Sequence, residues 1–225
     1  MKLARLAGFL YLIVIVTSLF SLLYVPSQLI VSGDAFSTFN NIKANESLLR
    51  YGIASWLFGQ IAFLLLPFVL YKLLKHINRD MAALMVVFVV VGVTLSLSSV
   101  MHRLDALTLL GNSTYLQAFS PEQLQAKLML ALKAYSNGML ITQMFWGLWL
   151  FPFGYLVFKS KILPRILGIL LMAGCFGYLL LVFGDVMNMA IPDFVTMPAA
   201  FGEIGIALWL LFIGVRESKI IEDLK

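Results

Sequence analysis

Phe145 to Leu180 reads FWGLWLFPFGYLVFKSKILPRILGILLMAGCFGYLL and contains two long apolar runs joined by a short bridge, Lys159 to Arg165. A run of about 20 apolar residues can cross a hydrocarbon layer about 30 Å thick as a helix that rises about 1.5 Å per residue. The bridge carries three cations and no acid, and short cationic loops stay on the cytoplasmic side of a membrane. The stretch therefore predicts two membrane-spanning helices joined by a cytoplasmic turn.

The composition of the whole chain agrees with this interpretation. The 225 residues are 61% hydrophobic and 12% charged, whereas soluble domains are about one-quarter charged. The net charge of +5 comes from short cationic clusters at the ends of apolar runs, where cations meet lipid headgroups, and no basic face is interleaved with aromatic residues. We therefore expect the lipid bilayer as a partner and no nucleic acid.

Six segments are long and apolar enough to span a bilayer, and they predict the fold. Their approximate bounds are 6–25, 51–74, 81–101, 134–158, 164–186 and 196–215. The first is longer than the apolar region of a signal peptide and lacks an Ala-x-Ala site, so we interpret it as a retained helix. The prediction is an all-α, polytopic six-transmembrane-helix bundle that forms a single domain over residues 1–225.

The distribution of cations sets the orientation of this bundle. With the amino terminus in the cytoplasm, eleven of the sixteen cations fall on the inner side and five on the outer side. The inner cations are Lys2, Arg5, Lys72, Lys75, Arg79, Lys159, Lys161, Arg165, Arg216, Lys219 and Lys225; the outer ones are Lys43, Arg50, Arg103, Lys127 and Lys133. We therefore expect both termini in the cytoplasm.

The first two outer loops each carry a signal for a short interfacial helix. Ser32-Gly33-Asp34 offers a turn and a helix cap, and Ser120-Pro121-Glu122-Gln123 offers a cap, a proline at the first helical position and a glutamine three residues after the cap. We expect the helices that follow these caps to lie along the headgroups, the second over residues 121–133.

Blocks of sequence spread along nearly the whole chain carry a resemblance to a known family. They are Ile30 to Asp34, Ala44 to Ile53, Gly154 to Ser160, Leu163 to Gly168, Gly202-Glu203 and Ala207 to Leu210. In these blocks the chain resembles the bacterial membrane proteins grouped as domain of unknown function 4386. The resemblance implies a multi-pass membrane fold, with the bacterial cytoplasmic (inner) membrane as the expected location, and brings no activity with it.

Ionisable and amide side chains inside apolar runs mark the candidate site, because a charge at the bilayer centre costs several kcal/mol. Glu203 is the strongest candidate, and Ala199 and Ala207 place it on a face of small residues suited to helix packing. The other members lie at a similar depth in the outer half: Gln60, His102, Arg103, Gln143 and Asp185. We predict that these six residues line an outward-opening polar pocket, with Arg103 paired to Glu203 or Asp185. Glu203 would then bind a proton or a cation.

Three classes of function stay open at this point. The pocket binds or transports a small molecule, a lipid or an ion; or the buried polar groups only hold the helices, or a partner, in place; or, least favoured, Glu203 and Asp185 serve an intramembrane enzyme. His76 and His102 are the two histidines and fall on opposite membrane faces, so we expect no metal site. No cofactor motif is present, and catalytic residues are not assigned. Ala173, Gly177 and Gly184 allow close helix contact within the bundle or in a homodimer.

Overall fold

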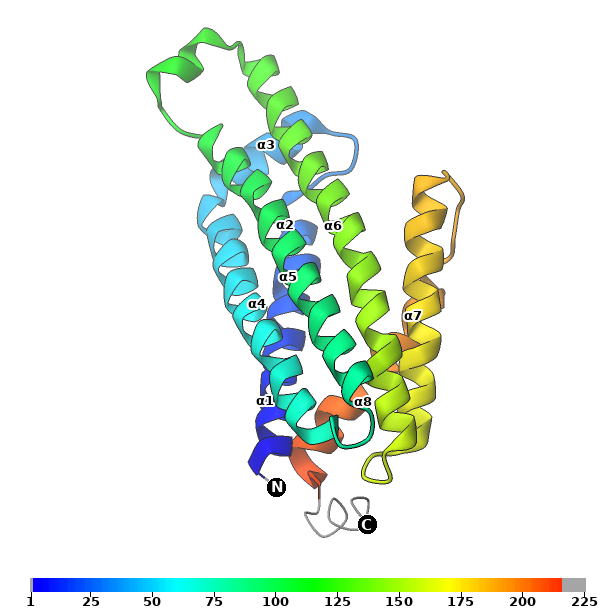
Figure 1. Ribbon diagram of the computed structural model, residues 1–225. Coiled ribbons are helices and arrows are strands. Elements are labelled where there is room, and N and C mark those ends of the chain that lie inside the picture. Colours follow the sequence, from blue (N-terminus) through cyan, green and yellow to red (C-terminus); the bar gives the residue numbers. More distant parts are fainter. Residues whose placement is uncertain (1, 216–225) are drawn as a thin grey trace. The chain divides into compact units, whose positions relative to one another are not determined.

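The computed structural model describes residues 2–215, and all of the regular structure in this range is helical (Figure 1). The α-helices are α1 (Lys2–Ser18), α2 (Val25–Leu29), α3 (Ala35–Ala44), α4 (Glu46–Leu74), α5 (Arg79–Thr108), α6 (Pro121–Lys159), α7 (Arg165–Val186) and α8 (Met197–Leu208). The π-helices are η1 (Leu19–Tyr24) and η4 (Trp209–Ile213), and the 3-10 helices are η2 (Thr114–Ala118) and η3 (Asp193–Thr196).

Six helical stretches have the length and apolar composition of membrane spans. They are Lys2–Leu29, Glu46–Leu74, Arg79–Thr108, Pro121–Lys159, Arg165–Val186 and Asp193–Ile213. Each one contains or closely overlaps one of the six segments predicted from the sequence. The prediction of an all-helical chain with six spans is confirmed, and the structure is that of a multi-pass membrane protein. The predicted cytoplasmic carboxyl terminus, with Arg216, Lys219 and Lys225, lies outside the described residues.

The chain forms two compact units. Unit 1 consists of the described parts of Met1–Ile15, Ile61–Thr94 and Leu140–Lys225, and unit 2 consists of Val16–Gln60 and Leu95–Met139. Helices α1, α4, α5 and α6 each contribute a segment to both units. The predicted single domain over residues 1–225 stays a prediction.

In unit 1 the cationic bridge is a tight turn between α6 and α7. Ser160 is fully buried there, with its N–H bonded to the Leu156 carbonyl and its hydroxyl to the Val157 carbonyl. The two helices approach closely where glycines face each other, because a Cβ added at Gly154 would lie 2.6 Å from the Gly168 carbonyl oxygen. Small residues permit such backbone approach in membranes, where apolar side chains gain little by leaving lipid.

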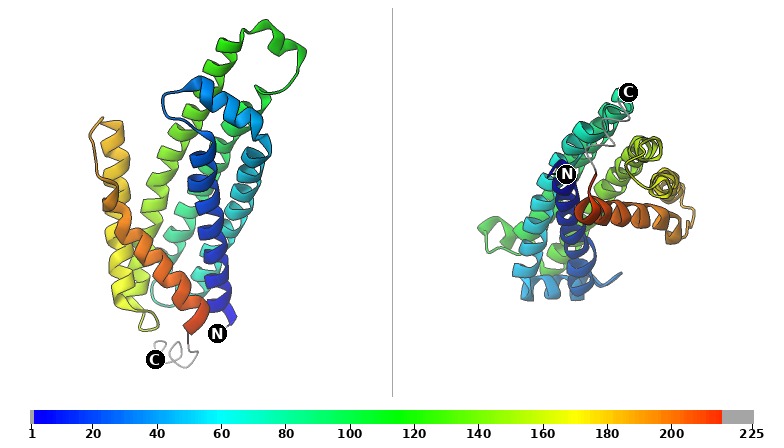
Figure 2. Two further views of the ribbon diagram at one scale, coloured as in Figure 1. Left: turned by 180° about the vertical axis from the view of Figure 1, so that it is seen from behind. Right: turned by 90° about the horizontal axis from the view of Figure 1, so that it is seen from below.

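Helices α7 and α8 lie side by side as an antiparallel pair, with α8 oblique to α7 (Figures 1 and 2). Added Cβ atoms at Gly174 and Gly205 would lie 2.5 Å from the Ala199 Cβ and 2.6 Å from a Leu167 methyl carbon. Gly177 and Gly184 are also contact positions, against Val195 and Ile191, whereas Ala173 is exposed. The predicted close contact at Gly177 and Gly184 is therefore made within unit 1.

In unit 2 the first loop folds back through a capped helix. The Asp34 carboxylate accepts hydrogen bonds from the Ser37 N–H at 2.9 Å and the Ser37 hydroxyl at 2.6 Å, which starts α3. These two bonds, the hydroxyl first, hold the pKa of Asp34 below its usual value. The turn at Ser120 has the predicted form too, because the Ser120 N–H donates to the Gln123 side chain at 2.8 Å and starts α6.

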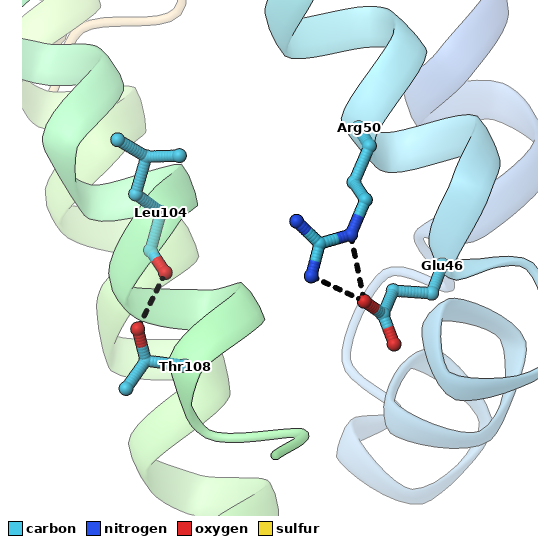
Figure 3. Close-up of polar contacts among 4 residues, drawn as sticks. All are labelled: Glu46, Arg50, Leu104 and Thr108. Carbon is cyan, nitrogen blue, oxygen red and sulfur yellow. Dashed lines mark hydrogen bonds and ion pairs between the residues drawn. The ribbon is translucent and has the colours of Figure 1, made fainter.

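The segments of α4 and α5 that belong to unit 2 carry two local polar contacts near their ends (Figure 3). Glu46 and Arg50 form an exposed ion pair one helical turn apart, with 2.6 Å between Oε1 and Nη2. On α5 the Thr108 hydroxyl donates to the Leu104 carbonyl at 3.0 Å. That bond uses the hydroxyl hydrogen of Thr108, so its oxygen keeps its capacity to accept.

Candidate functional site

Glu203 of unit 1 lies on α8 between two glycines, on the side of the helix that packs against protein. Ala199 and Ala207, one turn before and one turn after it, are buried, and so is Gly202. The small-residue face predicted for Glu203 is therefore a packing face. The carboxylate is partly buried and accepts a hydrogen bond from the Tyr11 hydroxyl, at 2.7 Å from Oη to Oε1.

A glycine on α1 brings Tyr11 to this carboxylate. A Cβ added at Gly8 would lie 2.5 Å from the Leu211 backbone nitrogen and 3.0 Å from the Ala207 carbonyl oxygen. Only a residue without a side chain therefore permits α1 to approach the end of α8 and η4 so closely. Tyr11 follows Gly8 by three residues, nearly one helical turn, and so lies on the same side of α1. Its side chain is 1% exposed.

Aromatic side chains surround the tyrosine that holds the carboxylate. Trp149 of α6 lies against Tyr11, with ring centroids 6.0 Å apart, and stacks on Phe153 at 5.2 Å. Phe63 meets the same indole edge-on at 5.4 Å. This packing fixes the tyrosine ring, so its hydroxyl is held in place before any ligand arrives.

The Tyr11 bond uses one of the two oxygens of the carboxylate. Tyr11 contacts Oε1, and the second oxygen, Oε2, is not used by that bond. A carboxylate in a membrane span is costly as a bare anion, and a hydrogen-bond donor, a proton or a cation offsets that cost. The arrangement can therefore hold a proton or a small cation on Oε2 while Tyr11 orients the group.

A second buried polar cluster belongs to unit 2 and begins with the π-helical turn η1. In this turn the Val25 N–H donates to the Phe20 carbonyl, five residues earlier in the sequence. In the same pattern the donor for the Ser21 carbonyl would be residue 26, which is a proline and has no N–H. The guanidinium of Arg103 supplies the missing donor, with Nη1 and Nη2 both 3.3 Å from the Ser21 carbonyl oxygen. The Ser21 hydroxyl donates to the Gly52 carbonyl at 2.7 Å.

Arg103 is also stacked on an aromatic ring. Its guanidinium carbon lies 4.0 Å from the centroid of Tyr135, and the arginine is 3% exposed. The Tyr135 hydroxyl is buried and has no hydrogen-bond partner among residues 2–215. Because a guanidinium is more weakly hydrated than an ammonium and stacks on rings, arginine is the cation best suited to this position.

The six residues predicted to form one pocket are distributed between the two units. Gln60, His102 and Arg103 belong to unit 2, and Gln143, Asp185 and Glu203 belong to unit 1. A pocket that joins them, and a pairing of Arg103 with Glu203 or Asp185, would link the units, and both stay predictions.

Within their own units these residues have different environments. In unit 2, Gln60 is buried and its Oε1 has no partner in the described part of the chain, while His102 is partly exposed and lies 3.2 Å from the Asp105 carboxylate. In unit 1, Gln143 is partly buried on α6, and Asp185 is exposed in the last turn of α7. Of the three predicted site residues in unit 1, Glu203 is therefore the one that the fold holds through a hydrogen bond, from Tyr11.

Tyr11 and Tyr135 were not among the predicted site residues. A tyrosine inside an apolar run carries a weak signal, because aromatic residues are common in spans as packing elements. For Tyr11 the usable signal is the glycine one turn earlier in the same run, which marks a close helix approach. Among residues 2–215 the structure has no cluster of three or more histidine, cysteine, aspartate or glutamate side chains that could hold a metal ion.

Six apolar spans with ionisable groups inside them define a multi-pass α-helical membrane protein. The chain belongs to the family described as Domain of unknown function (DUF4386), whose model matches residues 6–214. No curated protein and no solved structure matches the chain.

Proposed function

We propose that this protein binds a proton or a small cation in the membrane and transports it, with Glu203 as the group that exchanges it. The observation that carries the proposal is the 2.7 Å hydrogen bond from Tyr11 to one oxygen of a carboxylate inside a membrane span. A carboxylate that can accept a proton or a cation at that depth lets charge pass without a bare anion in the hydrocarbon layer. Tyr11 sets its orientation.

The structural alternative rests on the same bond. Tyr11 and Glu203 come from α1 and α8, so the bond joins helices 192 residues apart in the sequence and could serve only to hold them together. The two functions predict different results when the charge alone is removed. Glu203→Gln keeps the size of the side chain and an oxygen that can accept from Tyr11, so it changes ion binding more than packing.

Flux measurements in vesicles separate these functions. Purified full-length protein is placed in phospholipid vesicles with an imposed membrane potential and, in separate experiments, a dye inside that is selective for protons, Na⁺ or K⁺. It is expected to pass at least one of these cations faster than protein-free vesicles. Glu203→Gln is expected to lower the flux to the protein-free rate. Asp193→Asn, which neutralises an exposed carboxylate in η3, is the matched control and is expected to leave the flux unchanged.

Two outcomes contradict the proposal. The first is a wild-type flux no greater than that of protein-free vesicles for all three cations. The second is a Glu203→Gln variant with full flux but a lower unfolding temperature, which assigns the bond to structure alone.

We further propose the bacterial cytoplasmic membrane as the location, with both termini in the cytoplasm. The bias of cations toward the Lys72 to Arg79 and Lys159 to Arg165 turns supports this orientation. Helix α3 would then lie along the outer headgroups. Residues 121–133 belong to the unbroken helix α6 and would continue its span outward instead of lying along the headgroups. Cysteine accessibility on intact cells tests it, because a cysteine at Lys161 should be protected from an impermeant reagent and one at Lys43 should react.

A further inference from the structure

An open groove in unit 2, with a volume of about 350 Å³, lies where α5 ends. Three parts of the chain line it: α5 contributes Asp105 and Thr108, η2 with the residue that follows it contributes Tyr115 and Phe119, and α6 contributes Lys127 and Ala131. Its walls therefore combine an acid, a base, two hydroxyls and apolar surface. None of these residues belongs to the Glu203 cluster or to the Arg103 cluster.

The position along α5 places this groove at the level of lipid headgroups. The span Arg79–Thr108 has 30 residues, and at about 1.5 Å per residue it is about 44 Å long. That length matches the about 40–45 Å of a bilayer with its headgroup layers, so its two ends fall in those layers. Asp105 and Thr108 lie in the last turn of this helix.

The side chains sort into an acceptor side and a donor side. Asp105 and Thr108 are three residues apart on α5, and Thr108 has already given its hydroxyl hydrogen to Leu104 (Figure 3), so both present accepting oxygens. Across the groove, the Lys127 ammonium lies 4.4 Å from the centroid of the Phe119 ring, which holds this donor at the groove. Tyr115 adds a phenolic hydroxyl that can donate.

We propose that this groove binds the headgroup of a phospholipid that carries a primary ammonium and a phosphate, as phosphatidylethanolamine does. The ammonium would donate to Asp105 and Thr108, and the phosphate would accept from Lys127 and Tyr115. The opposite charges of Asp105 and Lys127 match this zwitterion, and the headgroup depth of the groove favours a lipid over a soluble molecule. A trimethylated ammonium has no N–H to donate, and a glycerol headgroup has no positive charge for Asp105.

Native mass spectrometry of the full chain in detergent tests the proposal. The probe is an equimolar mixture of phosphatidylethanolamine, phosphatidylcholine and phosphatidylglycerol with the same acyl chains. The expected result is a preference for phosphatidylethanolamine, which falls about fivefold in Lys127→Gln and in Asp105→Asn, because an exposed charged contact contributes about 1 kcal/mol. Lys127→Arg keeps the charge and is expected to retain the preference.

A matched control variant isolates the groove. Lys133→Gln removes an exposed cation from the same helix outside the groove and is expected to leave the lipid preference unchanged. All of these side chains are at the surface or partly exposed, and unfolding temperatures near that of the wild type confirm that the variants fold.

The proposal is overturned if the wild type shows no preference for phosphatidylethanolamine, or if Lys133→Gln lowers the preference as much as Lys127→Gln. Soluble glycerophosphoethanolamine has the same headgroup without acyl chains, so it tests whether the groove binds a membrane lipid or a soluble molecule with that headgroup. It should fail to displace the lipid at millimolar concentration. Displacement at equal concentration would show a soluble ligand in place of a membrane lipid and would refute the lipid assignment.

Discussion

Replacing Gly8 with alanine tests how the fold builds the Glu203 cluster. The added Cβ would lie 2.5 Å from the Leu211 backbone nitrogen, about 1 Å inside ordinary van der Waals contact. Helix α1 must then either accept the overlap, at about 1–3 kcal/mol, or move away and lose the Tyr11 bond to Glu203, at about 1.5–3 kcal/mol for a bond to a charged group. Either response predicts a loss of about 1–3 kcal/mol in the free energy of unfolding.

The assay is unfolding of the purified protein in mixed micelles, followed by tryptophan fluorescence. Phe9→Ala is the matched control, because Phe9 is the next residue on α1 and its side chain is 53% exposed. Its change is expected to stay within about 0.5 kcal/mol. A loss at Phe9→Ala as large as at Gly8→Ala would show that the assay reports general damage to α1.

A double-mutant cycle with Tyr11→Phe then tests the link between the two residues. If Gly8 positions the Tyr11 hydroxyl on Glu203, the cost of Gly8→Ala falls in the Tyr11→Phe background, because the bond is already gone. Additive costs, or a stabilising Gly8→Ala, would refute the reasoning that the glycine serves this contact.

Three further predictions concern other parts of the fold. Arg103→Lys is expected to lower the free energy of unfolding by about 1–3 kcal/mol, because an ammonium replaces neither the planar stacking of the guanidinium on Tyr135 nor its paired N–H donors to Ser21. Pro26→Ala should reduce that cost, because it gives the Ser21 carbonyl a backbone N–H. Gly174→Leu is expected to lower the unfolding temperature by forcing α7 and α8 apart, whereas an exposed alanine-to-leucine change at Ala173 should not. The Asp34 cap should protect the amides of α3 from hydrogen exchange above the usual carboxyl pKa of about 4, and this protection should be lost as pH falls through the lowered pKa of Asp34 in the folded protein. Asp34→Asn should remove this pH dependence of the protection. An unchanged pH profile in that variant would contradict the role of Asp34 as the cap.

The sequence predicts the spans well because length and hydropathy are local properties. The turn from Lys159 to Arg165, the cap at Asp34 and the cap at Ser120 also follow from short patterns, since each depends on residues within one helical turn. Glu203 was identifiable for a similar reason: a carboxylate in an apolar run is costly wherever the rest of the chain lies.

The partners of these groups could not be predicted in the same way. Tyr11 is 192 residues from Glu203, and their contact depends on the helix approach that Gly8 permits. The Ser21 carbonyl becomes available to Arg103 only because η1 is π-helical and is followed by a proline, and apolar periodicity does not predict a π-helical turn. Grouping polar residues by depth therefore identified candidates, but it did not predict the contacts that Glu203 makes with Tyr11 and Arg103 makes with Ser21.

The most direct test of the account is an infrared titration of the full chain in lipid bilayers. If Glu203 exchanges a proton in the membrane, one component of the carbonyl band of protonated carboxylic acids should come from Glu203 and appear and disappear with pH. That component should be absent in Glu203→Gln and unchanged in Asp193→Asn, and its titration should move in Tyr11→Phe. A spectrum in which Glu203→Gln removes no titrating band would contradict the claim that Glu203 is the exchanging group.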